Sequence, residues 1–138
     1  MKTTGAWIVA GIVALGAAGC GGSDDKRQDP AAADRAAVTR VLGQLQEASR
    51  AGDGNRICSQ IFTPKLADSV TRAARSGSCA IEVREKLFSP RTRLTVQDVT
   101  VTDPANATAT VKEANGNTST VFFVKQSGRW RIRSVQAA

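Results

Sequence analysis

The chain has 138 residues, of which 41% are hydrophobic and 4% aromatic, and its 19 Lys and Arg against 12 Asp and Glu give a formal charge of +7. This length and composition fit one small domain with a single hydrophobic core and exclude a wholly disordered chain. The sequence has no His and no Tyr, which excludes an imidazole base, a His metal ligand, a Ser-His-Asp triad and a phenolic acid.

Residues 1–19 have the pattern of a bacterial export signal. Lys2 supplies a positive charge, and the apolar stretch from Ala6 to Ala18 has the length of a signal-peptide core but is too short for a stable membrane span. The sequence Ala17-Ala18-Gly19-Cys20 resembles the bacterial lipobox, with Ala in place of the commonest Leu at its first position. In a lipobox the Cys takes a diacylglyceryl group and becomes the mature N-terminus. The alternatives are an ordinary signal cleaved after Ala18, which leaves Cys20 as a free thiol, and an uncleaved anchor.

Residues 20–30 are predicted to tether the domain to a membrane. The segment from Gly21 to Asp29 has no aliphatic or aromatic side chain, and its charges nearly cancel. This is typical of a flexible linker rather than of a polybasic membrane-binding tract. We therefore expect an extracytoplasmic protein that is anchored to the bacterial cell membrane by a lipid on Cys20. Nucleic acid is not an expected partner, because the chain is exported and has no nucleic-acid-binding motif.

The two other cysteines, Cys58 and Cys79, are predicted to form a disulfide, because an exported domain folds in an oxidising compartment. Closing this loop would stabilise the domain by roughly 3.4 kcal/mol in the chain-entropy estimate, which is an upper value because native strain subtracts from it. Two buried free thiols are the alternative. A metal site made from two Cys without any His is less favoured still.

Residues 31–138 are predicted to form the domain, and residues 31–51 its first helix. Apolar residues with helical spacing are Ala37, Val38, Val41, Leu42 and Leu45. Gly52-Asp53-Gly54 ends this helix. Asp53 can cap a short second helix that contains Ile57, Cys58, Ile61 and Phe62.

Two more helical segments are predicted before the strands. Thr63-Pro64 places a hydroxyl cap before a Pro, which is typical of a helix start, and Gly77 is expected to end that helix. Ser78 can cap a fourth segment, with Cys79 in its first turn, which runs to about Phe88.

After Arg91 the apolar residues alternate with period two, which predicts strands. The alternation changes phase at Gln97-Asp98, which predicts a β-bulge. Asp103-Pro104, Asn115-Gly116 and Ser127-Gly128 are turn sequences between four strands, and such short connections predict an antiparallel meander. Helices followed by strands indicate an α+β fold, in which N-terminal helices pack on one face of a curved antiparallel four-stranded sheet.

Three segments in this order resemble the nuclear transport factor 2-like superfamily: Ala51-Gly52-Asp53, Ala107–Val111 and Gly128–Ile132. The resemblance covers about residues 31–135. It implies an α+β cone, also called cystatin-like, with a pocket between the helices and the concave sheet and often a dimer formed through the sheet. With its lipobox and helical Cys pair, the chain is similar to small bacterial envelope lipoproteins without an assigned activity. The fold does not imply one function.

Enzymes of that superfamily use side chains that this chain lacks. Those similar to steroid isomerases pair a carboxylate base with phenolic or carboxylic donors, and the dehydratases use a His-Asp pair. Neither set can be assembled without Tyr and His. The acids of the sheet half are Asp98, Asp103 and Glu113, and neighbouring turns explain the last two. Asp98 at the bulge is the one candidate for an inward carboxylate, although solvent exposure is the favoured prediction.

The aromatic residues Phe123 and Trp130 are expected to fill the core, because aromatic residues are few; the alternative is that they line a pocket. The third strand is apolar on both faces from Val121 to Val124. Its outer face is therefore expected to be covered by a second copy of the chain, by a membrane partner protein or by a helix.

A basic face is predicted on the last strand. If Trp130 and Ile132 point inward, Arg129, Arg131 and Arg133 share the outer face. Lys112 and Lys125 are expected nearby. Such a face either is solvated or contacts anionic lipid headgroups or wall polymer.

Together these features predict a membrane-tethered, non-enzymatic binding or interaction domain, with no cofactor and no catalytic residue. A pocket that binds a small apolar ligand is the first alternative, and a minor enzyme that uses the Asp98 carboxylate is the second. The expected partners are the membrane, through the lipid, and an envelope protein, a homodimer partner or a small apolar ligand. An open cavity lined by Trp130 would favour ligand binding, and a filled cone would favour a scaffold.

The lipobox yields the first testable prediction. Intact-mass analysis of the protein extracted from membranes should show an acylated N-terminal Cys20, and Cys20→Ala should release the protein or stall its processing. A soluble product that starts at Gly19 would contradict the prediction.

Overall fold

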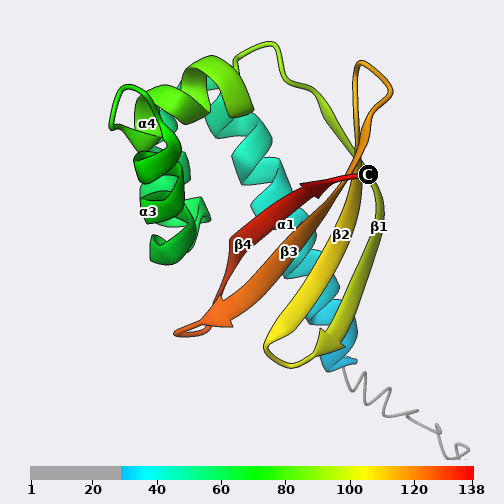
Figure 1. Cartoon of the computed structure of the whole chain (residues 1–138). Helices are drawn as coiled ribbons and strands as arrows, with labels where there is room; N and C mark the ends of the chain where they lie inside the picture. The colour runs from blue at the N-terminus through cyan, green and yellow to red at the C-terminus, as the bar shows by residue number, and fades with distance from the viewer. Residues whose placement is uncertain (1–28) are drawn as a thin grey trace, which may run out of the picture.

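The structure is a computed structural model, and it describes residues 29–138. The predicted signal peptide, the predicted lipidation site Cys20 and the linker as far as Gln28 lie outside the described residues. The chain within them is α+β, with N-terminal helices packed on a curved antiparallel four-stranded sheet, which confirms the predicted fold class (Figure 1).

The longest helix, α1 (Pro30–Ala51), crosses one face of the sheet (Figure 1). The Asp29 side chain caps it by accepting the Ala31 N–H at 3.0 Å, and Pro30 occupies the first helical turn. Gly52 ends the helix with φ +66, a left-handed conformation that Gly adopts without steric cost. Its buried residues are Val38, Val41, Leu42, Leu45, Ala48 and Ser49. None of the described helices is long and apolar enough to span a bilayer.

The remaining helical segments are α2 (Gly54–Arg56), η1 (Ile57–Ile61), α3 (Pro64–Ala73), α4 (Cys79–Glu82) and η2 (Val83–Leu87). The predicted caps Asp53, Thr63 and Ser78 each accept a backbone N–H three residues further on. The end predicted for α3 at Gly77 is wrong. The helix stops at Ala73 because the buried Ala74 adopts an extended conformation, and Gly77 lies in the turn that follows.

The second and fourth predicted helices each widen into a π-helical segment. In η1 the backbone N–H of Phe62 donates to the Ile57 carbonyl at 2.8 Å. In η2 the N–H of Phe88 donates to the Val83 carbonyl at 2.7 Å in the same way. Such wide turns are rare and often lie at functional sites. Here each one ends on a phenylalanine.

The disulfide between Cys58 and Cys79 is present, with the two Cα atoms 6.2 Å apart, and it confirms the predicted pair. It joins η1 to α4. Just before η1, Gly54 of α2 approaches α4 so closely that a Cβ atom there would collide with the backbone carbonyl of Ala80. A residue larger than Gly would therefore push α2 and α4 apart.

The sheet contains β1 (Leu94–Asp103), β2 (Asn106–Glu113), β3 (Thr118–Gln126) and β4 (Arg129–Ala137), paired antiparallel in chain order. The predicted bulge is present in β1, where the register shifts between Val96 and Asp98. A second, unpredicted shift lies between β3 and β4: Phe122 pairs with Ser134, whereas Phe123 pairs with Ile132. Arg133 is the extra residue of that bulge.

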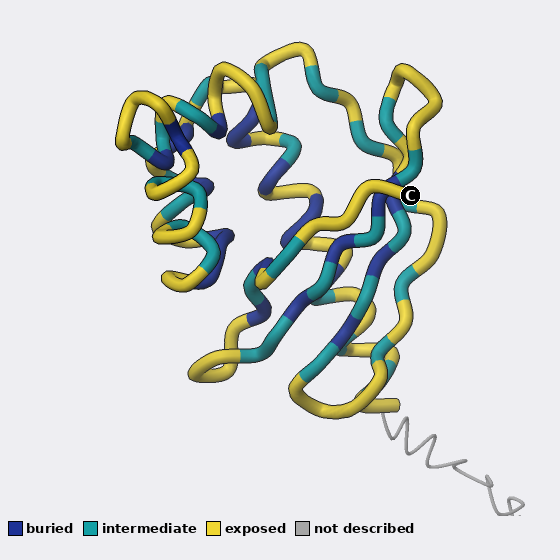
Figure 2. The backbone as a smooth tube through the Cα atoms, viewed as in Figure 1, coloured by how far each residue is buried: buried dark blue, intermediate teal, exposed yellow. Residues whose placement is uncertain are grey.

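The core lies between α1 and the concave face of the sheet. Figure 2 shows the buried residues gathered on α1 and the central strands, whereas β1 is half-buried or exposed throughout. The predicted core residues Phe123 and Trp130 are 0% and 5% exposed, so both fill this core. The Gln46 side chain of α1 fixes the start of β1, because it donates to the Thr92 carbonyl and accepts the Leu94 N–H, each at 2.7 Å.

Asp34 joins the start of α1 to the β3–β4 hairpin. Its carboxylate accepts from Lys125 Nζ at 2.9 Å and from Trp130 Nε1 at 3.0 Å. The Lys125 ammonium also lies 5.5 Å from the Trp130 ring centroid. The hydrogen bond from Lys125, and then that from Trp130, holds the pKa of Asp34 below its ordinary value.

The disulfide should contribute a large share of the domain's stability. We expect Cys79→Ser to lower the free energy of unfolding by about 2–4 kcal/mol, because the unfolded chain is no longer cross-linked. Urea unfolding of the oxidised protein, the reduced protein and the variant measures this. Equal stability of all three would contradict the expectation.

The lowered pKa of Asp34 predicts a pH dependence of stability. The unfolded carboxyl takes up a proton near pH 4, at a higher pH than the folded one. The stability that the ionised Asp34 contributes is therefore complete above about pH 4 and is lost as the pH falls through the folded pKa. Asp34→Asn should lower stability at neutral pH and flatten the acid side of the profile. Asp103 is the carboxyl group with which Asp34 is compared. Its pKa is also lowered, by hydrogen bonds from the Ala105 N–H and the Asn106 side chain within a turn. An unaltered acid slope in Asp34→Asn would contradict the prediction.

Candidate ligand-binding site

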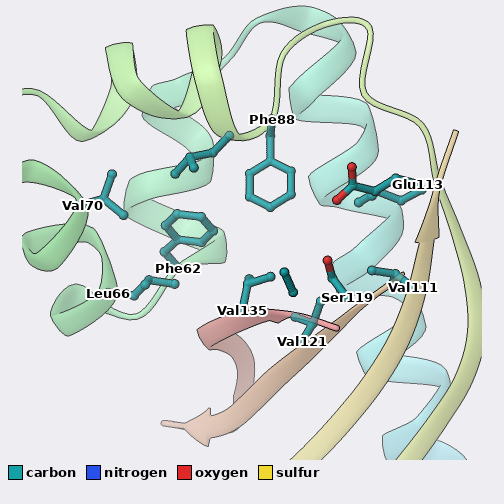
Figure 3. A pocket seen from close by; sticks show the side chains of 12 residues that line it. Phe62, Leu66, Val70, Phe88, Val111, Glu113, Ser119, Val121 and Val135 are labelled. Carbon is teal, nitrogen blue, oxygen red and sulfur yellow. The ribbon is translucent and has the colours of Figure 1, made fainter. Parts of the chain in front are cut away.

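A cavity of about 310 Å³ lies between the concave face of the sheet and the helical segments (Figure 3). Residues of all four strands form its floor: Leu94 of β1, Val111 and Glu113 of β2, Ser119 and Val121 of β3, and Val135 and Ala137 of β4. Strand register brings them together, because Val111 pairs with Ser119 and Val121 pairs with Val135. Its volume falls at the lower end of the range for small-molecule sites.

The opposite wall of the cavity is apolar and aromatic. Leu66 and Val70 of α3 contribute to it, together with Phe62 and Phe88 at the ends of the two π-helical segments. The two phenylalanine rings meet edge to face, with centroids 6.2 Å apart and planes at 68°. The wide turns of η1 and η2 therefore bring both rings to one wall.

Two polar side chains interrupt the apolar lining. Glu113 is half-buried, and Ser119 is buried with 6% of its surface exposed. In Figure 3 the Glu113 carboxylate and the Ser119 hydroxyl both point into the cavity. Asn115 Nδ2 donates to one oxygen of the Glu113 carboxylate at 3.2 Å. No ion pair between described residues involves Glu113, and no Lys or Arg is among the described residues that line the cavity.

Large apolar side chains remain exposed at the rim of the cavity. Leu87 is 47% exposed and Val135 is 40% exposed, and both line it. Ile81 of α4 is similarly exposed, at 37%, but lies outside the lining. The cavity therefore opens to solvent through an apolar rim.

The structure places the predicted candidate residues elsewhere. Trp130 is buried beside Asp34 and does not line this cavity, but it lines a separate, more polar cleft of about 340 Å³ with Arg40 and Arg129. Asp98 is exposed at its bulge, as favoured by the sequence, and accepts a hydrogen bond from Thr100 Oγ1 at 3.0 Å. It too lies outside the lining. No group of three Cys, Asp or Glu side chains within residues 29–138 is close enough to hold a metal ion.

The three arginines of the predicted basic face have different surroundings, although Trp130 and Ile132 are buried as that prediction required. Arg131 is half-buried and donates to the carbonyls of Ser59 and Phe62 at 3.1 and 3.2 Å, because β4 runs beside η1. Arg133 lies over the Phe122 ring, 5.7 Å from its centroid. Arg129 is exposed and lines one cleft with Arg131 and another with Arg40 of α1.

The two lysines expected beside that face also lie apart. Lys112 is exposed on β2, whereas Lys125 lies on the inward face and is bound to Asp34. On the outer face of β3, Phe122 and Val124 are half-buried, and Arg133 covers part of Phe122 within the same chain. A homodimer through this face stays a prediction.

Two features of the sequence point to the cavity residues Phe62, Phe88 and Glu113. The π-helical segments share a short repeat, in which an apolar residue is followed four positions later by Ile or Leu and then directly by Phe, a hydroxyl residue and Pro: residues 57–64 and residues 83–90. The repeat places Phe62 and Phe88 at the same position of the two segments. Glu113 is two residues beyond the inward Val111, so strand alternation places it on the concave face.

Comparison with known proteins assigns no family to this chain. No protein-family model matches it, and no curated protein matches it at a significant level. The chemistry of the cavity is therefore the guide to function.

Proposed function

We propose that this protein is a membrane-tethered envelope lipoprotein whose domain binds a small, mainly apolar ligand in the cavity between sheet and helices. The observation that carries the proposal is a solvent-accessible cavity of about 310 Å³ with apolar walls and an apolar rim. The rim favours an occupant energetically, because each Å² of apolar surface removed from water contributes about 25 cal/mol. A ligand that covers Leu87 and Val135 would gain that energy.

The placement of the cavity supports a tethered binding protein. The linker joins the domain at Asp29, and the first turns of α1 lie beside the end of β3 and the start of β4, as the Asp34 contacts show. Ala137 lines the cavity from the opposite end of β4. The cavity is thus at the end of the sheet that is remote from the linker (Figure 1). A lipid on Cys20 would leave its opening free of the membrane surface.

The disulfide and the fold support the remaining parts of the proposal. A stable disulfide fits an oxidising, extracytoplasmic compartment. A cavity between helices and a concave sheet is the feature implied by the resemblance to the nuclear transport factor 2-like superfamily, and we propose membership of it on that ground. The proposed activity is binding, since the lining offers one carboxylate and one hydroxyl as its polar side chains.

Filling the rim should abolish ligand binding without unfolding the protein. Octanol serves as a neutral apolar probe for the full chain held in lipid nanodiscs, with the methyl resonances of Val121 as the readout. We expect Val135→Trp to weaken octanol binding by about tenfold or more, because the indole occupies the cavity. Val135 is already partly exposed, so its replacement should be tolerated.

Ile81→Trp is the matched control, because Ile81 is equally apolar and almost equally exposed but lies outside the cavity. It should bind octanol like the parent. The proposal is wrong if octanol leaves the Val121 resonances of the parent unmoved, or if both Trp variants bind as the parent does.

A further inference from the structure

We propose that the ligand is an amphiphile with a cationic, hydrogen-bond-donating head, such as a primary ammonium group, which Glu113 and Ser119 bind while the apolar body lies against Phe62 and Val121. The inference rests on the proposed function, because it names the class of ligand for the same cavity. It depends on the position of one carboxylate within an otherwise apolar lining.

The charge of the cavity is opposite to that of the protein. The chain carries a formal charge of +7, yet the charged side chain that lines the cavity is an acid. None of the ion pairs between described residues involves this carboxylate. Beside low-dielectric walls an unpaired carboxylate attracts a cation more strongly than it would in bulk water, and it repels an anion by the same physics. Arg91 and Arg93 line a neighbouring cleft with Glu113 but do not line this cavity, so the charged side chain inside the cavity is negative and favours a positive head group.

Hydrogen bonding leaves this carboxylate free to bind a head group. Asn115 Nδ2 donates to one carboxylate oxygen of Glu113, which orients the group, and the second oxygen remains available. The Ser119 hydroxyl faces the same space and can accept a further hydrogen bond (Figure 3). An ammonium group has three donors and no acceptor, so it suits two acceptor side chains. A ligand with a carboxylate head would find no Lys or Arg among the described residues that line the cavity.

The aromatic wall is compatible with the same head group. Phe88 lines the cavity on the side toward which the Glu113 carboxylate points (Figure 3). A cation near an aromatic face is attracted by the ring quadrupole. Further into the cavity the lining has only apolar side chains from α3 and the central strands, such as Leu66 and Val121, which would cover an alkyl chain.

Three probes with one alkyl body separate the head-group preference from binding itself: octylamine, octanol and octanoate. The full chain is held in lipid nanodiscs, and affinity is read from the Val121 methyl resonances. Each probe partitions into lipid to the same extent for every variant, so the ratio of affinities between variants is independent of partitioning. We expect Glu113→Gln to weaken octylamine binding by about tenfold or more. Octanol binding should be unaltered.

The matched control is Asp98→Asn, which removes the same charge from the same sheet but outside the cavity. It should leave octylamine binding unchanged, which excludes a general effect of net charge. Ser119→Ala should weaken octylamine binding less than Glu113→Gln does. Thermal unfolding of each variant shows whether the fold is retained.

The outcomes distinguish the two proposals. Binding of all three probes that Val135→Trp blocks but Glu113→Gln does not alter would overturn the cationic head group and leave the apolar binding function standing. Stronger binding of octanoate than of octylamine would overturn it too. Failure of every probe to bind the parent would overturn the proposed function, and the inference with it.

Discussion

The attachment of the helical wall to the edge of β4 is the constraint on which the rest of the structure depends. Phe62 forms a parallel bridge with Ile132, and the Thr63 N–H donates to the Ile132 carbonyl at 2.8 Å. Arg131 adds hydrogen bonds to the carbonyls of Ser59 and Phe62. These contacts place the end of η1 directly beside the sheet. The cavity lies beyond that attachment, over the far end of β4, where Leu66 of α3 and Leu87 of η2 line the space without filling it.

The disulfide extends this constraint to the second half of the wall. Cys58 belongs to the attached segment, and Cys79 begins the helix that leads to Phe88. Through it, the position of Phe88 is linked to the edge of β4. The same bond that stabilises the domain therefore also sets the separation between the aromatic wall and the strands. A cavity held in this way can stay open without a ligand, which suits binding better than a core that collapses when it is empty.

Local patterns predicted most of the fold. The caps Asp53, Thr63 and Ser78, the bulge at Asp98 and the three hairpin turns all depend on neighbouring residues, and the sequence displays them directly. The extra residue at Arg133 was missed. The apolar spacing nevertheless changes there, from Ile132 to Val135 three residues on, as it does between Val96 and Val99 in β1.

The site was harder to predict than the fold, because it is defined by empty space. The size of Trp130 made it a candidate to line a pocket, but its indole N–H donates to Asp34 and its ring is in the core. Glu113 was explained by its turn alone. The hydrogen bond from Asn115 confirms that contact, but the carboxylate also points into the cavity. Strand alternation places Glu113 on the concave face, but no local pattern shows that the space above it is left unfilled by the helical segments.

The most direct test of the account is a crystal structure of the full chain grown with octylamine. We predict electron density for the alkyl chain between Phe62 and Val121, with the nitrogen within hydrogen-bonding distance of the Glu113 carboxylate and the Ser119 hydroxyl. A cavity closed by a rotated Phe88, or an amine bound only at the protein surface, would contradict the account.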